Sequence, residues 1–375
     1  MALPRFKAAA CHLASVFGSA RQTTDKTIGF MRKAAQNSAQ LVVFPESSIP
    51  GFPYWSSIIA PATGHDFFRY MAEESVYVDG EEIKAIQQAA LQSRIVISLG
   101  FSEKVRYSSA TLFNSNLIIG DDGQILVHHR KLMPTFFEKL TWSPGDGHGL
   151  RVADTRLGKI GALICGENTN PLARYALMAQ GEQVHISSWP AIWPTRLPLD
   201  GEPTPATGNY DNVNANTIRA AAHCFEAKCF GIQSAGVLDH ASIQGIAQMT
   251  SDPRRTTKIL STYPQATTQF LDPNGHLIKS RIVWPSSDVQ DEGLCLQNEE
   301  GVLIADIDLN KCVEGKQYHD VVGGYQRLDV FNLQVNRNRH EPVVFASGKK
   351  TEHDPPETAS CSGSKSTKDS GGIAR

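Results

Sequence analysis

Short apolar runs that alternate with amphipathic stretches are the feature that most constrains this chain. The runs at 6–13 and 40–46 are predicted to be buried strands. After them, residues 20–39 and 79–94 place apolar side chains at the three- and four-residue spacing of one helix face. This alternation continues through the first two thirds of the chain. A chain with this order is expected to form sheets covered by helices, in the α/β class.

Two segments interrupt the alternation and predict hairpins. Residues 111–131 resemble two strands joined at Asp122-Gly123, and residues 268–283 resemble two strands joined by a Pro-Asn-Gly turn. Hairpins make neighbouring strands antiparallel, whereas strand–helix–strand units make them parallel. The sequence therefore predicts mixed sheets in a layered α/β arrangement.

Composition limits the number of domains and the kinds of partner. Of the 375 residues 41% are apolar, which is enough for a sizeable core. From residue 347 the chain is rich in Ser, Gly, Lys and Thr, so the sequence predicts one domain over 1–346 and a disordered tail over 347–375. The net charge of −2 argues against nucleic-acid binding. The sequence contains no run of 18 apolar residues, so it predicts no membrane-spanning helix.

The cysteines indicate a reducing compartment. Seven cysteines are scattered along the chain without a disulfide framework, so reduced thiols in the cytoplasm are the simpler expectation. Cys224 and Cys229 lie five positions apart without a second pair, which is a poor zinc pattern.

Cys165 lies where a predicted strand gives way to a turn. In the segment KIGALICGENTNP the apolar run ends at Ile164, and Gly166 allows a sharp turn before a helix at Leu172. A thiol at such a turn is either inert packing or a nucleophile. A nucleophile needs a base, and it needs a donor for the negative charge that develops on the substrate.

Charged residues that suit this chemistry follow two other predicted strands. Glu46 follows the strand in VVFPESSIPGFPYW, and apolar surroundings would raise its pKa as a general base near neutrality requires. Lys131 ends the strand in VHHRKLMPTFFEKLTWSPGDG, and Glu138 comes seven positions later. His128 and His129 are alternative bases for a cysteine, but neighbouring strand residues point to opposite faces. Each of these residues taken alone is more typical of surface or packing.

Together the three contexts resemble the nitrilase superfamily, the carbon–nitrogen hydrolases with a Glu-Lys-Cys triad. The matching positions are Glu46 in FPES, Lys131 in HRKLMPT and Cys165 in ICGEN, and a second family glutamate matches Glu138 in PTFFEKLTW. The segments PGFPYW, SPGDG, ALMAQGEQVHISSWP and GGYQRLDVFNL are similar to the nitrilase branch. The resemblance covers about residues 5–335.

The resemblance implies both a fold and a reaction. The expected fold is a four-layer αββα sandwich that assembles into a homodimer or a larger spiral homo-oligomer. Glu46 would take the thiol proton of Cys165, whose sulfur attacks a nitrile carbon, and Lys131 would stabilise the charge on nitrogen. Glu138 would orient the lysine and the substrate. Water would then release ammonia and the carboxylic acid, with no metal and no organic cofactor.

Substrate contacts are expected from the matching segments. Tyr54, Gly166 and Trp189 are predicted to contact a small-molecule nitrile, although the two aromatic residues also fit a buried core. Many relatives have Trp in place of Gly166, and GGYQRLDVF stands for the usual GHYSRPDVF. Residues 237–265 do not match the family and are expected to form a variable pocket or interface loop.

Three rival functions stay open at this stage. An amidase or carbamoylase would use the same triad on an amide. A nitrile or cyanide hydratase would stop at the amide, which depends only on the group that leaves the tetrahedral intermediate. A non-catalytic scaffold protein would be expected to lack a triad residue, and here all are present. Glu138 also has an alternative as a surface ion-pair partner of Lys139 or Arg130.

The tail composition predicts that residues 348–375 are dispensable. A chain that ends at residue 347 should keep its melting temperature within about 2 °C, because no core residue is removed. Its turnover should equal that of the full chain. Thermal unfolding and an activity assay on both forms test this, and a truncated chain without activity would contradict it.

Overall fold

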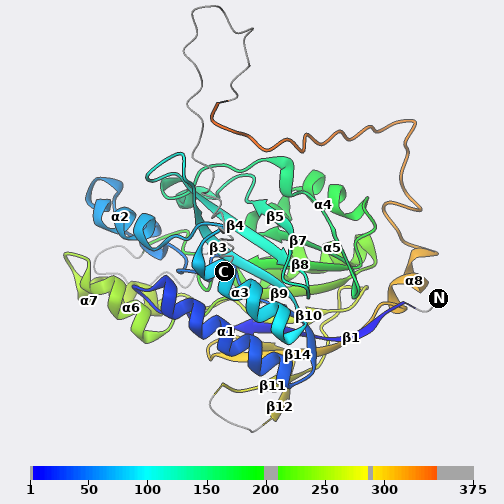
Figure 1. The fold of residues 1–375 in the computed structure, drawn as a ribbon, viewed down its shortest axis with the longest axis horizontal. Coiled ribbons are helices and arrows are strands. Elements are labelled where there is room, and N and C mark those ends of the chain that lie inside the picture. The colour runs from blue at the N-terminus through cyan, green and yellow to red at the C-terminus, as the bar shows by residue number, and fades with distance from the viewer. Residues whose placement is uncertain (1–2, 198–209, 286–289, 344–375) are drawn as a thin grey trace, which may run out of the picture. The chain divides into compact units, whose positions relative to one another are not determined.

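Figure 1 shows the fold in a computed structural model, which describes residues 3–197, 210–285 and 290–343. The chain divides into one unit over Met1–Arg339 and another over His340–Arg375. The elements below all belong to the first unit. The predicted domain boundary at 346/347 and the predicted disorder of 347–375 lie outside the described residues and stay predictions.

The first sheet has eight strands in the order β12-β11-β14-β1-β2-β3-β4-β5. Their bounds are β1 Arg5–His12, β2 Ala39–Val43, β3 Val96–Lys104, β4 Leu112–Ile119, β5 Ile125–Arg130, β11 Ser280–Val283, β12 Gln290–Gly293 and β14 Gly301–Asp308. The neighbours β1, β2 and β3 run parallel, and the other pairs are antiparallel. This is a mixed sheet, as the combination of hairpins and alternation predicts.

The second sheet has six strands in the order β13-β10-β9-β8-β7-β6. Their bounds are β6 Ala153–Thr155, β7 Gly158–Ile164, β8 Val184–Trp189, β9 Phe230–Ala235, β10 Thr268–Leu271 and β13 Cys295–Leu296. The three central strands β7, β8 and β9 are parallel. They are connected through α4 (Pro171–Met178) and α5 (Asn212–Ala227), which are the helical crossovers that parallel strands need.

The two sheets and their helices form four layers. Along β1, Phe6, Ala8 and Ala10 contribute to the apolar core that also holds side chains of β8 and β9, whereas Ala9 and Cys11 pack with α1 (Ala20–Gln36) and α3 (Glu81–Ser93). This two-residue alternation places one strand between two apolar layers. On the far side, α4 and α5 pack against the second sheet through smaller clusters. The predicted αββα sandwich is confirmed.

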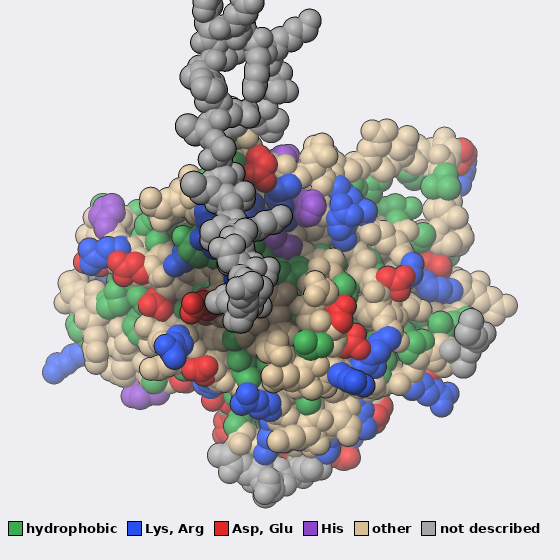
Figure 2. Space-filling view, in the orientation of Figure 1, with side chains coloured by type: hydrophobic (Ala, Val, Ile, Leu, Met, Phe, Trp, Pro, Cys, Tyr) green, Lys and Arg blue, Asp and Glu red, His purple; other side chains and the backbone are tan. Residues whose placement is uncertain are grey.

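The remaining helices lie outside this layered core of the described chain. They are α2 (His65–Glu74), α6 (His240–Gln248), α7 (Pro253–Thr262) and α8 (Lys311–Lys316). None of the helices in the described ranges is both long and apolar enough to cross a membrane. On the face shown in Figure 2, acidic and basic side chains are intermixed, as expected from a net charge of −2.

One predicted hairpin is confirmed, and the other forms only next to its turn. Residues 111–131 form β4 and β5, which pair antiparallel across a turn where Gly123 has a φ of +78°. Residues 268–283 pair as a hairpin only next to the turn, where Leu271 and Leu277 form an antiparallel bridge. Beyond this bridge β10 belongs to the second sheet, while β11 joins the first beside β14. The turn at Asp272–Gly275 does form. The local signal predicts the turn, but the sheet that receives each strand depends on long-range packing.

The segment 237–265 is largely helical. Asp239 and Asp252 accept hydrogen bonds from the backbone N–H groups of Ser242 and Arg255 and so begin α6 and α7. The two helices pack together, and their apolar side chains join the aromatic cluster around Phe52, Trp55 and Trp193. The expected loop is therefore wrong in its structure. Its role at a pocket or interface stays a prediction.

Candidate active site

Three strand ends bring the predicted triad together. Glu46 lies just beyond β2, Lys131 follows the last residue of β5, and Cys165 follows the last residue of β7. Through the antiparallel partner β4, β5 runs in the same direction as β3 and β2, so their carboxyl ends share one sheet edge. The site thus combines residues from both sheets of the sandwich.

The ammonium group of Lys131 lies between two carboxylates. Its Nζ is 2.8 Å from Oε1 of Glu46 and 2.6 Å from Oε2 of Glu138, and all three side chains are 0% exposed. Asn114 donates from Nδ2 to the same Glu46 oxygen at 2.7 Å, and the backbone N–H of Thr135 donates to Glu138 at 2.9 Å. Glu138 is therefore not at the surface, and its ion-pair partner is Lys131 rather than Lys139 or Arg130.

Cys165 lies against this charged group. Its sulfur, one oxygen of Glu46 and one oxygen of Glu138 all lie within 4.8 Å of one another. The residue has a φ of +50°, in the left-handed region, at the point where β7 turns into a short 3₁₀ helix. Such a conformation is uncommon for a residue other than glycine and costs free energy that neighbouring contacts must offset.

Gly166 makes a close approach to the side chain of Thr135. A Cβ atom added to Gly166 would lie 2.6 Å from Oγ1 of Thr135. A larger residue there would displace Thr135, whose backbone N–H binds Glu138. The presence of glycine instead of the common Trp at position 166 therefore fits the close packing against Thr135.

Burial sets the protonation states. It raises the pKa of the Glu46 carboxyl to about 7, against the opposing attraction of Lys131. Burial, and next the charge of Glu46, raise the pKa of the Cys165 thiol well above its usual range. Burial alone would lower the pKa of Lys131, but the ionised form of Cys165 and the charges of Glu138 and Glu46 raise it well above its usual range. At neutral pH the site therefore holds an ammonium, a thiol and a carboxyl close to its midpoint.

Each carboxylate keeps one oxygen for other partners. Oε2 of Glu46 and Oε1 of Glu138 are buried and have no hydrogen-bond partner within the part of the chain that the structure describes. A buried acceptor without a partner is costly in a folded protein, and such groups often belong to functional sites. These two oxygens can accept a proton from a thiol or water, or a hydrogen bond from a substrate N–H.

A cavity of about 380 Å³ opens beside the thiol. Its lining residues are Thr135, Cys165, Gly166, Thr169, Trp189, Pro190, Trp193, Tyr210, Asn212, Asn216 and Arg219. Two of the predicted substrate contacts, Gly166 and Trp189, are among them. Tyr54 is not, because its hydroxyl accepts a hydrogen bond from the N–H of Ala191 and it lines a separate cavity of about 30 Å³ next to Glu46.

Glu167 braces the nucleophile turn against the end of β5. Its carboxylate accepts hydrogen bonds from the backbone N–H groups of Ile164 at 2.8 Å and Leu132 at 2.6 Å, and it pairs with His129. Burial alone would raise the pKa of Glu167, but the His129 ring and these N–H donors lower it. His128 instead contacts Glu103 at 2.8 Å. Both histidines thus pair with glutamates rather than with Cys165.

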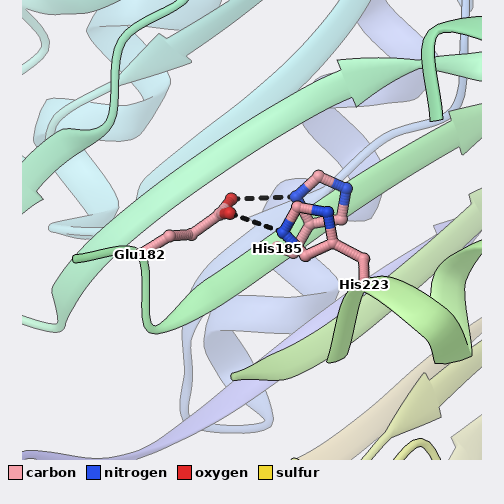
Figure 3. A group of neighbouring side chains, drawn as sticks. All are labelled: Glu182, His185 and His223. Carbon is pink, nitrogen blue, oxygen red and sulfur yellow. Dashed lines mark hydrogen bonds and ion pairs between the residues drawn. The ribbon is translucent and has the colours of Figure 1, made fainter. Parts of the chain in front are cut away.

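A second buried cluster, drawn in Figure 3, consists of Glu182, His185 and His223 and is connected to the same turn through Asn168. The Glu182 carboxylate contacts Nδ1 of His185 at 2.9 Å and Nε2 of His223 at 2.7 Å. His185 continues through Nε2 to the side-chain oxygen of Asn168 at 2.8 Å. The Asn168 amide in turn donates to the carbonyl oxygen of Cys165 at 3.0 Å. The strained turn is therefore connected to a buried carboxylate two side chains away.

Hydrogen-bond accounting assigns protons in this cluster. Because the nitrogen of Asn168 donates, its oxygen accepts, and Nε2 of His185 must donate to it. The other nitrogen of His185 faces the carboxylate of Glu182. Burial alone would raise the pKa of Glu182, but its contacts with the two histidines outweigh burial and lower this pKa to about 2. Burial lowers the pKa of His223 to about 4, so this second ring is neutral.

The same three residues also lie close enough to be weighed as metal ligands, since one ligand atom of each lies within 4.8 Å of the others. The two imidazole rings are stacked, with centroids 3.5 Å apart and planes 13° apart. An imidazole binds a metal close to its own plane at about 2.0–2.1 Å, and one ion cannot lie in two stacked planes. The geometry fits a hydrogen-bonded clamp rather than a metal centre.

The sequence analysis missed this cluster and the polar side of the cavity. Glu182 and His185 flank the start of the apolar run of β8, and His223 lies on the face of α5 that packs on the sheet. A charged or imidazole side chain within a buried pattern is a signal in principle, because such groups are rarely buried without a partner. The partner itself, however, is 41 residues away from Glu182 in the chain.

Comparison with known families identifies the chain. Residues 7–317 match the carbon-nitrogen hydrolase family. The protein belongs to this family, in agreement with the resemblance of its sequence motifs to the nitrilase superfamily.

Individual relatives place the chain near nitrilases and cyanide hydratases. A nitrilase from Paraburkholderia phymatum is 33% identical over 340 residues, which cover 90% of this chain and 88% of the relative. A cyanide hydratase from Gibberella zeae is 33% identical over 349 residues, with 92% and 91% covered. The solved carbon-nitrogen hydrolase from Helicobacter pylori G27 has a TM-score of 0.60 at 18% identity and covers 84% and 92% of the two chains. This last similarity shows the fold.

Removal of the central carboxylate should destabilise the sandwich strongly. In Glu182→Gln the two buried imidazoles of His185 and His223 lose their shared carboxylate partner, so the free energy of unfolding should fall by about 3–5 kcal/mol. Urea denaturation followed by circular dichroism measures this. The control is Asp306→Asn at an exposed pair with Lys7, whose side chains are 82% and 40% exposed, and the expected loss there is below about 1 kcal/mol. Equal losses in both variants would contradict the assigned charges.

Proposed function

We propose that this protein hydrolyses an organic nitrile to the carboxylic acid and ammonia. In this proposal Cys165 is the nucleophile, Glu46 the general base, Lys131 the group that stabilises charge on nitrogen, and Glu138 the residue that holds Lys131. The observation that supports it most is the convergence of the Cys165 sulfur with one oxygen each of Glu46 and Glu138 within 4.8 Å. The ammonium of Lys131 lies between the two carboxylates.

The first half of the reaction forms a bond between sulfur and carbon. Because Cys165 rests as a thiol, its proton must leave during the attack, and a free oxygen of Glu46 can accept it. As the sulfur adds to the nitrile carbon, one π bond of the nitrile becomes a lone pair on nitrogen. Lys131 stabilises this charge, and the proton held by Glu46 passes to the nitrogen. The product of this half is a thioimidate.

The second half consumes two water molecules. Glu46 takes a proton from the first water, whose oxygen adds to the thioimidate carbon and gives a tetrahedral intermediate. Glu46 passes this proton to the nitrogen, and the hydroxyl proton of the intermediate follows through the same carboxylate as the carbon–nitrogen bond breaks. The nitrogen thus leaves as ammonia, the hydroxyl oxygen becomes the carbonyl oxygen, and a thioester stays on Cys165. A second water, activated by the same carboxylate, cleaves the thioester, releases the carboxylic acid and returns the proton to sulfur.

Two related functions differ at single steps. A hydratase expels the thiol from the tetrahedral intermediate instead of ammonia, and an amidase begins from an amide. The similarity to cyanide hydratases motivates the first of these. The cavity of about 380 Å³ favours an organic nitrile over cyanide, since a molecule as small as water occupies only about 30 Å³.

Assembly into a homodimer or larger spiral also belongs to this proposal. Leu172 on α4 and Ile218 and Phe225 on α5 are 61%, 66% and 42% exposed on the outer helical layer. Ile218 and Phe225 are two helical turns apart, so they share one face of α5. An exposed apolar face of this kind suits a contact between two copies of the chain. The predicted cytoplasmic location stays a prediction.

Product analysis with a nucleophile variant tests the reaction. Purified protein is incubated with aliphatic, aryl and arylacetonitriles, with the matching amides and with cyanide, and acid, amide and ammonia are quantified. We expect acid and equimolar ammonia from a nitrile. Cys165→Ala should lower turnover by at least about 10⁴-fold, while Cys295→Ala at an exposed cysteine should be unaffected. Amide without ammonia would indicate a hydratase, and turnover of amides alone an amidase.

The pH dependence of kcat/KM tests Glu46 as the base. Only the ionised carboxylate can accept a proton, so kcat/KM should rise tenfold per pH unit and level off above a midpoint near the pKa of about 7. The hydrogen bond from Asn114 favours the ionised form, so Asn114→Ala should move the midpoint to higher pH. Asn116→Ala is the control, because this buried residue of the same strand bonds Ser98 instead. A midpoint that is unchanged in Asn114→Ala would exclude Glu46 as the titrating base.

A further inference from the structure

Arg219 places a positive charge in the wall of the cavity that contains Cys165. It extends from α5, lines the same cavity as the thiol, and stacks its guanidinium on the ring of Trp189, with Cζ 4.4 Å from the ring centroid. Its charge reaches the thiol, because it opposes the burial that raises the pKa of Cys165. The proposed reaction gives no role to this residue.

The partners of Arg219 are all neutral. Its Nε donates to the carbonyl oxygen of Ala215 at 2.9 Å, Nη1 to Oγ1 of Thr169 at 3.2 Å, and Nη2 to the side-chain oxygen of Asn216 at 2.9 Å. The second N–H of Nη2 donates to the hydroxyl of Tyr210. A guanidinium has five N–H groups, so one N–H of Nη1 is left. Within 3–197, 210–285 and 290–343, no carboxylate forms an ion pair with Arg219.

The neighbouring amides leave donors rather than acceptors. The side-chain oxygen of Asn216 accepts from Arg219, and its nitrogen donates to the side-chain oxygen of Asn212 at 3.3 Å. The Asn212 nitrogen donates to the carbonyl oxygen of Ala191 at 3.3 Å. Each amide oxygen therefore has a partner, while each amide nitrogen keeps a second N–H. A ligand group that matches this wall must accept hydrogen bonds and carry negative charge.

The rest of the cavity wall is apolar, and this indicates how such a ligand would lie. Trp189, Pro190 and Trp193 line the cavity with apolar surface. The cavity thus contains the Cys165 thiol, the Arg219 guanidinium and apolar surface that can contact a hydrocarbon chain or ring. A substrate with a reactive group at one end and a carboxylate at the other would contact all three regions.

We propose that the substrate is a nitrile that also carries a carboxylate, and that Arg219 and Asn216 bind this carboxylate. This inference rests on the proposed nitrile hydrolysis. In the bound state the free N–H of Nη1 and the free amide N–H of Asn216 donate to the carboxylate oxygens. Arg219 is then a specificity residue, and the chemistry at Cys165 is the same for a neutral nitrile that reaches the thiol.

The competing interpretation is that Arg219 only braces Tyr210 and Trp189. In that case its replacement would distort the cavity for every substrate alike. The proposed role instead predicts a loss that is larger for substrates with a carboxylate. A pair of substrates that differ only in that charge separates these two interpretations.

The experiment compares an ω-cyano carboxylate with its methyl ester, in wild type and in Arg219→Gln. Wild type should prefer the carboxylate at least tenfold in kcat/KM, and 0.5 M salt should reduce this preference, because salt screens exposed charges. Arg219→Gln should lose the preference through a higher KM for the carboxylate. Its kcat/KM for the ester should fall by a clearly smaller factor than that for the carboxylate, because only the loss of the Arg219 charge near Cys165 and of its stacking on Trp189 affects both substrates. Melting temperatures establish that each variant is folded.

Asn216→Asp is the second variant. It replaces a donor amide by a carboxylate of nearly the same shape, so it should turn the preference toward the ester. Equal losses of kcat/KM for both substrates in Arg219→Gln, or no preference for the carboxylate in wild type, would overturn the inference about Arg219. Hydrolysis of the nitrile group of the ester would in that case still support the proposed function. Failure of wild type to hydrolyse the nitrile of either compound would count against the proposed function itself.

Discussion

The ammonium of Lys131, buried between Glu46 and Glu138, is the interaction on which the rest of the site depends. A buried ammonium needs a counter-charge, and two carboxylates at 2.8 and 2.6 Å supply one more negative charge than it requires. Burial of the Glu46 carboxyl is the main reason why its pKa is raised to about 7, and the nearby charge of Glu138 adds to this, against the attraction of Lys131. The contact with Lys131 lowers the pKa of Glu46 and burial raises it, and the balance lies near neutrality, which suits the proposed role of Glu46 as a base.

The arrangement of Glu46, Lys131 and Cys165 depends on how the two sheets of the sandwich pack together, because these residues come from both sheets. Glu46 and Lys131 lie at the ends of β2 and β5 in the first sheet, and Cys165 lies at the end of β7 in the second. A small shift between the sheets would separate the thiol from the carboxylates. Two connections oppose such a shift: Glu167 joins the turn to the end of β5, and Asn168 joins it to the Glu182 cluster. The strained backbone at Cys165 is thus held from two sides.

Residues next to strand ends could be predicted from the sequence, and residues that meet through tertiary packing could not. Apolar runs followed by a charged or thiol side chain predict Glu46, Lys131 and Cys165 as strand-end residues, and the structure brings these three together. The contacts of Glu182 with His223 and of Arg219 with Trp189 join residues that no local pattern relates. The incomplete hairpin has the same origin. A Pro-Asn-Gly turn is a local property, but the sheet that accepts β11 is decided by its pairing with β14, about twenty residues later in the chain.

Chemistry and selectivity are therefore located on different elements. The groups proposed to make and break bonds lie at strand ends that are fixed by the two sheets, whereas Asn212, Asn216 and Arg219 lie on α5 at the cavity wall. A substitution on α5 changes the charge that faces a substrate without moving the buried ammonium or its carboxylates. If the proposed carboxylate contact is correct, Arg219, which stacks on Trp189, selects an anionic nitrile while the proposed chemistry at Cys165 is unchanged.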